Sequence, residues 1–270
     1  MSANNHIKKI TVPFIKKMKE RQEKISVLTA YDYLMAEMLD NAGIDIILVG
    51  DSAGMVVAGF ETTLRVTMDM MLYHVSVVNR GVKKALLVAD MPFLSYQTSA
   101  ADAIRNAGRF LQVGAEAVKL EGGEPVADTI KNLVNIGIPV MGHLGLTPQS
   151  INQFGSYRLV GKEETDADKL VKNAKILEQA GVFSLVLEKI PSGVAKKITE
   201  SINIPTIGIG AGKHCDGQVL VSHDMLGIFD KFEPKFVRRY ANLGLEMREA
   251  FKKYTADVKS GKFPDEDESY

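Results

Sequence analysis

Acidic residues repeatedly stand at the end of short apolar runs, and this pattern constrains the fold more than any other feature of the chain. The four clearest runs end at Asp51, Asp90, Glu121 and Glu188, and a weaker fifth run ends at Asp32. Acids at the carboxyl ends of buried strands are typical of parallel α/β folds, where the ends of the strands meet at the catalytic face. The pattern therefore predicts carboxylates from several strands at one shared location.

Eight apolar segments are predicted as strands, and most alternate with segments predicted as helices. The strands are expected at residues 26–30, 46–50, 85–89, 117–121, 139–143, 184–188, 206–210 and 218–222. The helices between them are expected at 33–42, 68–80, 100–113, 125–136, 166–180 and 192–201. Glycines such as Gly43 and Gly181 follow the helices, as favourable stop residues do. This rhythm predicts a (β/α)₈ TIM barrel with right-handed crossovers, in which the last crossover is too short for a full helix.

The length of the chain fits one barrel domain. A single (β/α)₈ barrel commonly has about 250 residues, so we expect residues 1–270 to form a single domain. Within residues 1–24, a basic amphipathic segment is expected to cap the bottom of the barrel. Helical structure is expected again over residues 234–254, and residues 261–270 are expected to form a mobile acidic tail.

Charge and hydropathy argue against several classes of function. The 33 Lys and Arg residues balance 33 Asp and Glu residues, so no net charge attracts nucleic acid or anionic membranes. No apolar run approaches the roughly 20 residues that span a bilayer, and the N-terminus lacks a signal-peptide pattern. The single cysteine, Cys215, excludes an intrachain disulfide and suits a reducing compartment. We therefore expect a cytoplasmic protein without nucleic-acid or membrane partners.

Asp51, Asp90 and Glu121 end three consecutive predicted strands, and neighbouring strands lie about 4.8 Å apart. Carboxylates this close repel one another unless a cation or a proton intervenes. Oxygen ligands suit Mg²⁺, which keeps several waters and often takes only one or two protein carboxylates. The three residues thus predict a Mg²⁺ site, in which some act through water. The alternative is that each acid caps the helix that follows it.

Other polar residues are predicted to face the same site. Lys119 lies two residues before Glu121, so both side chains share one face, where the lysine holds either an anionic substrate group or a carboxylate. Glu188 comes from the far side of the barrel and is a candidate general base, with a salt bridge at the rim as the alternative. His143 either hydrogen-bonds substrate or a carboxylate, or serves the structure alone. Ser52 follows Asp51 and is a further candidate.

Seven short motifs occur in an order that resembles one enzyme family. They are TAYD (29–32), VGDS (49–52), VADMPF (88–93), VKLEGG (118–123), GHLGLTPQ (142–149), IGIGAG (207–212) and CDGQVL (215–220). Each motif is weak alone, but the ordered set closely resembles ketopantoate hydroxymethyltransferases, from about residue 7 to the tail.

The resemblance implies a Mg²⁺-dependent barrel enzyme of pantothenate biosynthesis. Such an enzyme transfers one carbon from its cosubstrate 5,10-methylenetetrahydrofolate to 3-methyl-2-oxobutanoate, through a Mg²⁺-stabilised enolate, and gives 2-dehydropantoate. The family likeness also implies a homo-oligomer, a decamer. The matching motifs imply that the metal site is formed by Asp51, Asp90 and Glu121. They also imply that the substrate is contacted by Asp51, Ser52, Asp90 and Lys119, and that the base is Glu188.

Two rival functions are compatible with part of this pattern. Another Mg²⁺-dependent barrel enzyme acting on 2-oxo acids, a carbon–carbon lyase or phosphoenolpyruvate mutase, would chelate its substrate in the same way without folate. The position of Glu188 opposite the other acids, and the lack of an obvious cysteine acid, argue against it. A metabolite sensor without catalysis would keep the pocket but turn nothing over.

Overall fold

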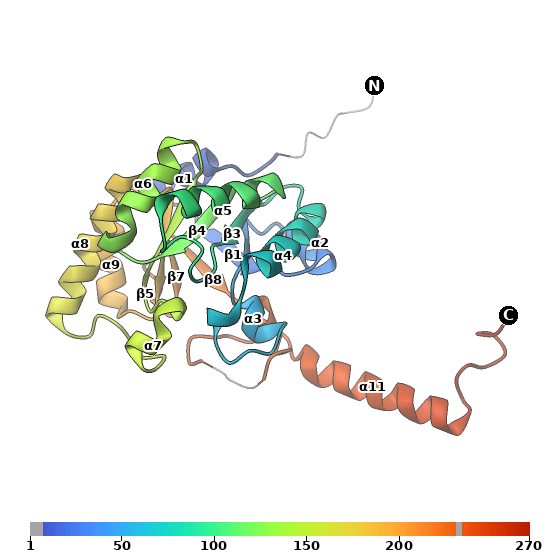
Figure 1. Cartoon of the computed structure of the whole chain (residues 1–270). Coiled ribbons are helices and arrows are strands. Elements are labelled where there is room, and N and C mark those ends of the chain that lie inside the picture. Colours follow the sequence, from blue (N-terminus) through green and yellow to red (C-terminus); the bar gives the residue numbers. More distant parts are fainter. Residues whose placement is uncertain (1–7, 231–233) are drawn as a thin grey trace. The chain divides into compact units, whose positions relative to one another are not determined.

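The chain folds around a closed barrel of eight parallel strands, as predicted. The computed structural model describes residues 8–230 and 234–270. The strands follow chain order around the barrel, and β1 closes it by pairing with β8 (Figure 1). They are β1 (Ile25–Thr29), β2 (Ile46–Val49), β3 (Leu86–Asp90), β4 (Ala117–Glu121), β5 (Val140–Gly145), β6 (Ser184–Glu188), β7 (Thr206–Ile209) and β8 (Gly217–Leu220).

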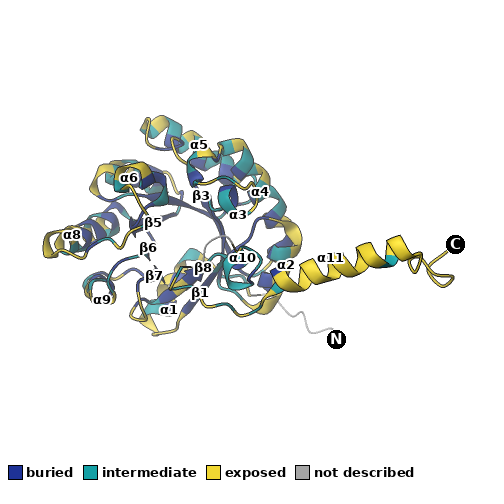
Figure 2. Cartoon of the chain, turned by 90° about the horizontal axis from the view of Figure 1, so that it is seen from below, coloured by how far each residue is buried: buried dark blue, intermediate teal, exposed yellow. Residues whose placement is uncertain are grey.

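Helices surround the barrel and leave its strands buried at the centre (Figure 2). They are α1 (Val12–Glu20), α2 (Tyr33–Ala42), α3 (Ala53–Val56), α4 (Met68–Gly81), α5 (Ala100–Gln112), α6 (Ala127–Asn135), α7 (Ile151–Phe154), α8 (Glu164–Ala180) and α9 (Ser192–Ser201). Two further helices, α10 (Ser222–Met225) and α11 (Leu243–Ser260), follow β8 in the chain. Three 3₁₀ turns are η1 (Thr63–Arg65), η2 (Glu124–Val126) and η3 (Pro148–Ser150). The connection from β7 to β8, over residues 210–216, contains no helix, as its length predicts.

Side chains and glycines at the helix ends explain where α2 begins and ends. Asp32 accepts a hydrogen bond of 2.9 Å from the Met35 backbone N–H, so the weakest of the five strand-end acids is an N-cap. Gly43 ends the helix with a φ of 84°, a left-handed conformation that glycine adopts without steric cost. Asp32 therefore serves the start of α2.

Two apolar layers hold the barrel together. The outer layer lies between strands and helices, and the inner layer fills the barrel with residues near the strand starts, including Ile46, Leu86 and Phe183. Ile15 and Met18 of α1 belong to this inner layer and are 0% and 6% exposed. Helix α1 therefore packs against the amino-terminal end of the barrel and leaves the carboxyl end for the site.

Residues Val221–Tyr270 form a second compact unit. The prediction of a helix over residues 234–254 has the wrong bounds, because α11 runs from Leu243 to Ser260. Residues before it pair with the chain around α10 instead, through hydrogen bonds such as Tyr240 N–H to the Met225 carbonyl at 2.8 Å. The residues of the acidic tail, 261–270, are exposed, and their mobility stays a prediction, as does the single-domain organisation. No described helix is both long and apolar enough to cross a membrane.

Candidate active site

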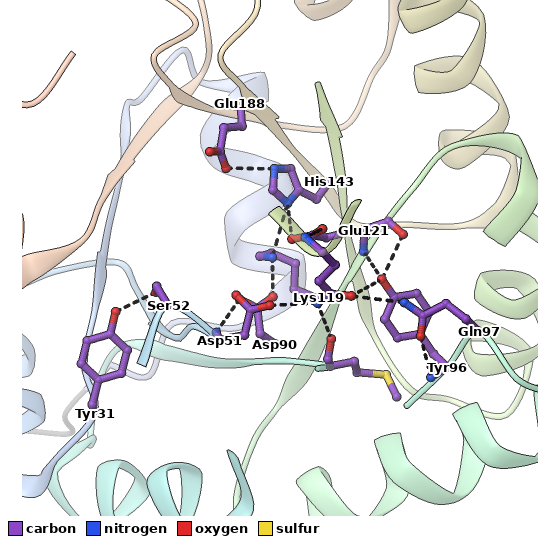
Figure 3. Close-up of polar contacts among 12 residues, drawn as sticks. Tyr31, Asp51, Ser52, Asp90, Tyr96, Gln97, Lys119, Glu121, His143 and Glu188 are labelled. Carbon is purple, nitrogen blue, oxygen red and sulfur yellow. Dashed lines mark hydrogen bonds and ion pairs between the residues drawn. The ribbon is translucent and has the colours of Figure 1, made fainter. Parts of the chain in front are cut away.

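Four of the strand-end acids meet at the carboxyl end of the barrel (Figure 3). Asp90, Glu121 and Glu188 are the last residues of β3, β4 and β6, and Asp51 follows β2 by two residues. Asp51, Asp90 and Glu121 are only 5%, 3% and 6% exposed. None of these three side chains caps the helix that follows it in the described part of the chain, so the capping alternative is wrong for them. Glu188 lies 3.2 Å from His143, so a salt bridge, its own alternative, is present beside the proposed role as base.

Lys119 forms an ion pair with Asp90 inside the barrel. The two residues are register partners on neighbouring strands, so their side chains share a face. Asp90 also accepts a 3.1 Å hydrogen bond from the Asp51 backbone N–H through Oδ2. Burial alone would lower the pKa of Lys119, but the charges of Asp90, Glu121 and Asp51 outweigh it and raise the pKa. The lysine is thus a fixed positive charge among the acids.

His143 links the two sides of the site. Its Nδ1 lies 3.5 Å from Glu121 Oε1, and its Nε2 lies 3.2 Å from Glu188 Oε2. Burial and the charge of Lys119 would lower the pKa of His143, but its interactions with Glu121 and Glu188 raise it to about 9. At neutral pH the ring is therefore an imidazolium that can donate to both carboxylates.

Burial raises the pKa of each of the three inner acids, but their other interactions differ. It raises the pKa of Asp51 well above its usual range, and the charges of Asp90 and Glu121 raise it further. Burial also raises the pKa of Asp90, against the opposing effect of Lys119. For Glu121, burial is outweighed by His143, Lys119 and the backbone N–H of Gln149, which together lower the pKa. Asp51 and Asp90 are therefore the carboxylates that lack sufficient positive charge.

Gln149 and Tyr96 complete the site, and neither was singled out from the sequence. Gln149 donates through Nε2 to Asp51 Oδ2 at 2.9 Å, and its backbone N–H donates to Glu121 Oε2 at 3.0 Å. The Tyr96 hydroxyl donates to Gln149 Oε1 at 2.9 Å and accepts from the Glu121 backbone N–H at 3.1 Å. Gln149 ends the GHLGLTPQ motif, which is the one sequence signal that pointed to it.

Two hydroxyl groups lie at other edges of the site. Ser52 Oγ lies 2.8 Å from the Tyr31 hydroxyl (Figure 3), so the predicted substrate contact Ser52 is held from outside the acid cluster. The buried Tyr157 hydroxyl has no hydrogen-bond partner among the described residues. Burial and the charges of Glu188 and Asp51 raise its pKa, so it stays a neutral phenol.

The charges of the cluster fit a divalent cation. Four carboxylates, those of Asp51, Asp90, Glu121 and Glu188, face two cations, Lys119 and His143 (Figure 3). The fully ionised cluster is therefore short of two positive charges, and its free donors are oxygens, as Mg²⁺ prefers. Among the described residues, no three acidic, histidine or cysteine side chains form a ready metal cage. The cluster therefore suits an ion that is bound by one or two of these carboxylates, and otherwise by water and substrate.

Comparison with known proteins decides the family. A family model described as ketopantoate hydroxymethyltransferase matches residues 9–266. The chain belongs to the ketopantoate hydroxymethyltransferase family. A 3-methyl-2-oxobutanoate hydroxymethyltransferase of Syntrophus aciditrophicus is 55% identical over 271 residues, with 100% of both chains covered. One of Clostridium kluyveri is 58% identical over 253 residues, covering 93% of this chain and 90% of the relative. Membership in this family makes the chain a transferase, and its name implies hydroxymethyl transfer in pantothenate synthesis.

Solved structures with similar folds are far more distant in sequence. A 2,3-dimethylmalate lyase of the PEP mutase/isocitrate lyase superfamily superposes with a TM-score of 0.63 at 16% identity, covering 92% of this chain and 88% of that one. A phosphonopyruvate hydrolase in complex with oxalate and Mg²⁺ superposes with a TM-score of 0.62 at 11% identity, covering 95% and 92%. These likenesses show that the chain shares its barrel fold with both enzymes.

Proposed function

We propose that this protein forms 2-dehydropantoate from 3-methyl-2-oxobutanoate, with 5,10-methylenetetrahydrofolate as the one-carbon donor and Mg²⁺ as the metal. In the balanced reaction, the C3–H bond of the oxo acid breaks and a C–C bond forms to the donor's methylene carbon. One water supplies the hydroxyl group, and tetrahydrofolate is released. The observation that carries the proposal is the cluster of buried acids around Lys119, in a chain of this family.

The oxo acid would lie between Asp51, Asp90 and Lys119. Lys119 is a buried cation, and a carboxylate is the substrate group that such a cation attracts most strongly. Ser52, held by Tyr31, offers a hydroxyl group at the same edge. Asp51 and Asp90 would hold Mg²⁺, with Glu121 acting through water because His143 and Gln149 already engage its two oxygens. When bound, the ion would supply a Lewis acid that stabilises negative charge on the ketone oxygen.

Glu188 would accept the proton from C3. His143 lies against Oε2 of this carboxylate, and no described residue hydrogen-bonds Oε1, so one oxygen is available for the proton. His143 orients Glu188 through Nε2, and the opposite ring nitrogen, Nδ1, contacts Glu121. These roles rest on the positions of this chain's own side chains.

The test is an assay of product formation by mass spectrometry. The protein is incubated with 3-methyl-2-oxobutanoate, 5,10-methylenetetrahydrofolate and Mg²⁺, then with excess chelator. We expect 2-dehydropantoate to form only with both donor and metal, and to stop on chelation. Turnover of 2,3-dimethylmalate or phosphonopyruvate, with no folate-dependent product, would favour the rival lyase or mutase. Ligand binding without any turnover would favour a sensor. The single buried cysteine, Cys215, suits work in the reducing cytoplasm, which we propose as its location.

A further inference from the structure

A cavity of about 610 Å³ opens beside the acid cluster, at the carboxyl ends of β4 and β5. Its volume lies within the range of about 300–1,000 Å³ that is usual for small-molecule sites. Glu121 and Gln149 line it and also belong to the acid cluster, so the cavity adjoins the proposed reaction site. The proposed binding of the oxo acid does not use this space.

Aromatic side chains provide flat apolar surfaces in the cavity. Phe93 and Phe154 line it, together with Tyr96 near Glu121. Phe93 is 38% exposed, although burial of a phenylalanine side chain is favourable. A planar ring bound in the cavity would cover this side chain and stack against it. Gln97, Gln153 and Asn173 also line the cavity and offer amide donors and acceptors for the edge of such a ring.

Two basic side chains stand at the exposed part of the cavity. Arg158 and Lys169 line it, and neither forms a side-chain ion pair with any acid in the described ranges. Asp166 lines it as well, so this exposed part retains one net positive charge. An arginine and a lysine without acidic partners favour an anionic group, and arginine binds a carboxylate with two parallel hydrogen bonds.

We propose that this cavity binds the one-carbon donor, with its ring between Phe93 and Phe154 and its carboxylate-bearing tail at Arg158 and Lys169. The inference rests on the proposed function, because reduced folates are flat heterocycles that carry glutamyl carboxylates at one end. The ring end would then lie beside Glu121, on the side of the cavity shared with the acid cluster. The donor and the oxo acid would thus approach from two separate sites that meet at Glu121 and Gln149.

The test compares the double variant Arg158→Gln/Lys169→Gln with the wild type. Equilibrium binding of tetrahydrofolate carrying one and several glutamates is measured by calorimetry. Proton exchange at C3 of 3-methyl-2-oxobutanoate, which needs no folate, is measured in parallel. We expect roughly 10-fold weaker tetrahydrofolate binding and a similar rise in KM for the donor, about 1.4 kcal/mol. The loss should be larger for the polyglutamate, and C3 exchange should stay at the wild-type rate.

Lys175→Gln is the matched control, because Lys175 is exposed on α8 but does not line the cavity. It should bind both tetrahydrofolates like the wild type. Phe93→Ala tests independently whether the ring of the donor stacks on Phe93. It should weaken binding of the tetrahydrofolate monoglutamate several-fold. Wild-type affinity in the double variant and in Phe93→Ala would overturn the cavity assignment. Wild-type protein that binds tetrahydrofolate here but forms no product would overturn the proposed function and leave the assignment supported.

Discussion

At the scale of single residues, the site is a set of carboxylates held apart by two internal cations. Lys119 pairs with Asp90, and His143 lies between Glu121 and Glu188. This arrangement separates the hydrogen-bonded pair Asp51 and Asp90, whose pKa values are raised, from the proposed base. The two carboxylates of the pair share one positive charge, that of Lys119, whereas the base contacts the imidazolium of His143. Substitution of Glu188 should therefore change kcat, and substitution of Asp90 should change the Mg²⁺ requirement.

Glu188→Gln removes the proton acceptor and keeps an oxygen for His143. We expect kcat to fall by about 10²–10⁴-fold, the usual contribution of a general base. Binding of 3-methyl-2-oxobutanoate with Mg²⁺ should stay within a few-fold of wild type. Steady-state kinetics and calorimetry measure the two quantities separately. A variant with wild-type kcat would remove Glu188 as the base.

Asp90→Asn removes one proposed metal ligand and the ion-pair partner of Lys119. We expect the Mg²⁺ concentration needed for substrate binding to rise by on the order of 10–100-fold, as for other changes around metal ligands. Titration of Mg²⁺ at fixed substrate measures this shift. Asp69→Asn, at an exposed acid of α4 that lies outside the site, is the control. An unchanged Mg²⁺ requirement would show that Asp90 serves the fold and not the metal.

The raised pKa of His143 predicts a pH dependence of stability. Because the folded pKa of about 9 exceeds the ordinary value of 6.5, protonation stabilises the fold fully below about pH 6.5. This contribution is lost as the pH rises through about 9. Urea unfolding with chelator present, in wild type and His143→Gln, should give a difference in unfolding free energy that shrinks by roughly 1–3 kcal/mol over this window. A difference that does not change with pH would contradict the assigned charge.

The sequence predicts the acids and the nearby Lys119 and His143, but not which side chain each acid contacts, and the reason is physical. Strand-end position is local, so Asp51, Asp90 and Glu121 were predicted from apolar runs alone. The choice of Asp90 as the partner of Lys119 depends on the register between β3 and β4, which no local pattern contains. Gln149 and Tyr96 reach the site from loops, whose path is set by tertiary contacts.

At the scale of elements, strand and helix positions were predicted closely because the apolar runs are short and bounded by glycines. The expected strand at 184–188 and the helices at 33–42 and 192–201 agree with β6, α2 and α9. The helix expected over 234–254 was misplaced, because its first residues satisfy their backbone groups through pairing near α10 instead. Long-range backbone pairing of this kind leaves no local signal.

Helix α1 supplies a test of the barrel's inner layer. Ile15→Ala should lower the free energy of unfolding by about 2–5 kcal/mol, because the side chain is fully buried among inner-layer residues. Chemical denaturation measures the change. Lys16→Ala, at the adjacent exposed position, should stay within about 0.5 kcal/mol of wild type. Equal stability of the two variants would mean that α1 does not cap the barrel in solution.

At the scale of the whole molecule, exposed apolar residues agree with self-association. Met247, Phe251 and Tyr254 of α11 are 43%, 62% and 58% exposed, as are Leu34 and Met38 of α2 at 64% and 58%. We propose the decamer that the family likeness implies. Sedimentation should then give about ten times the chain mass of 29.6 kDa. A species of one chain mass at micromolar concentration would contradict it.

The central claim is that the acid cluster, loaded with a divalent cation, lets Glu188 remove the C3 proton of a 2-oxo acid. Proton exchange at C3 of 3-methyl-2-oxobutanoate in deuterium oxide, followed by NMR without folate, tests it most directly. We expect exchange that requires Mg²⁺, stops when a chelator is added and resumes when Mg²⁺ is restored. Exchange that continues at the same rate in chelator, or none at saturating Mg²⁺, would contradict it.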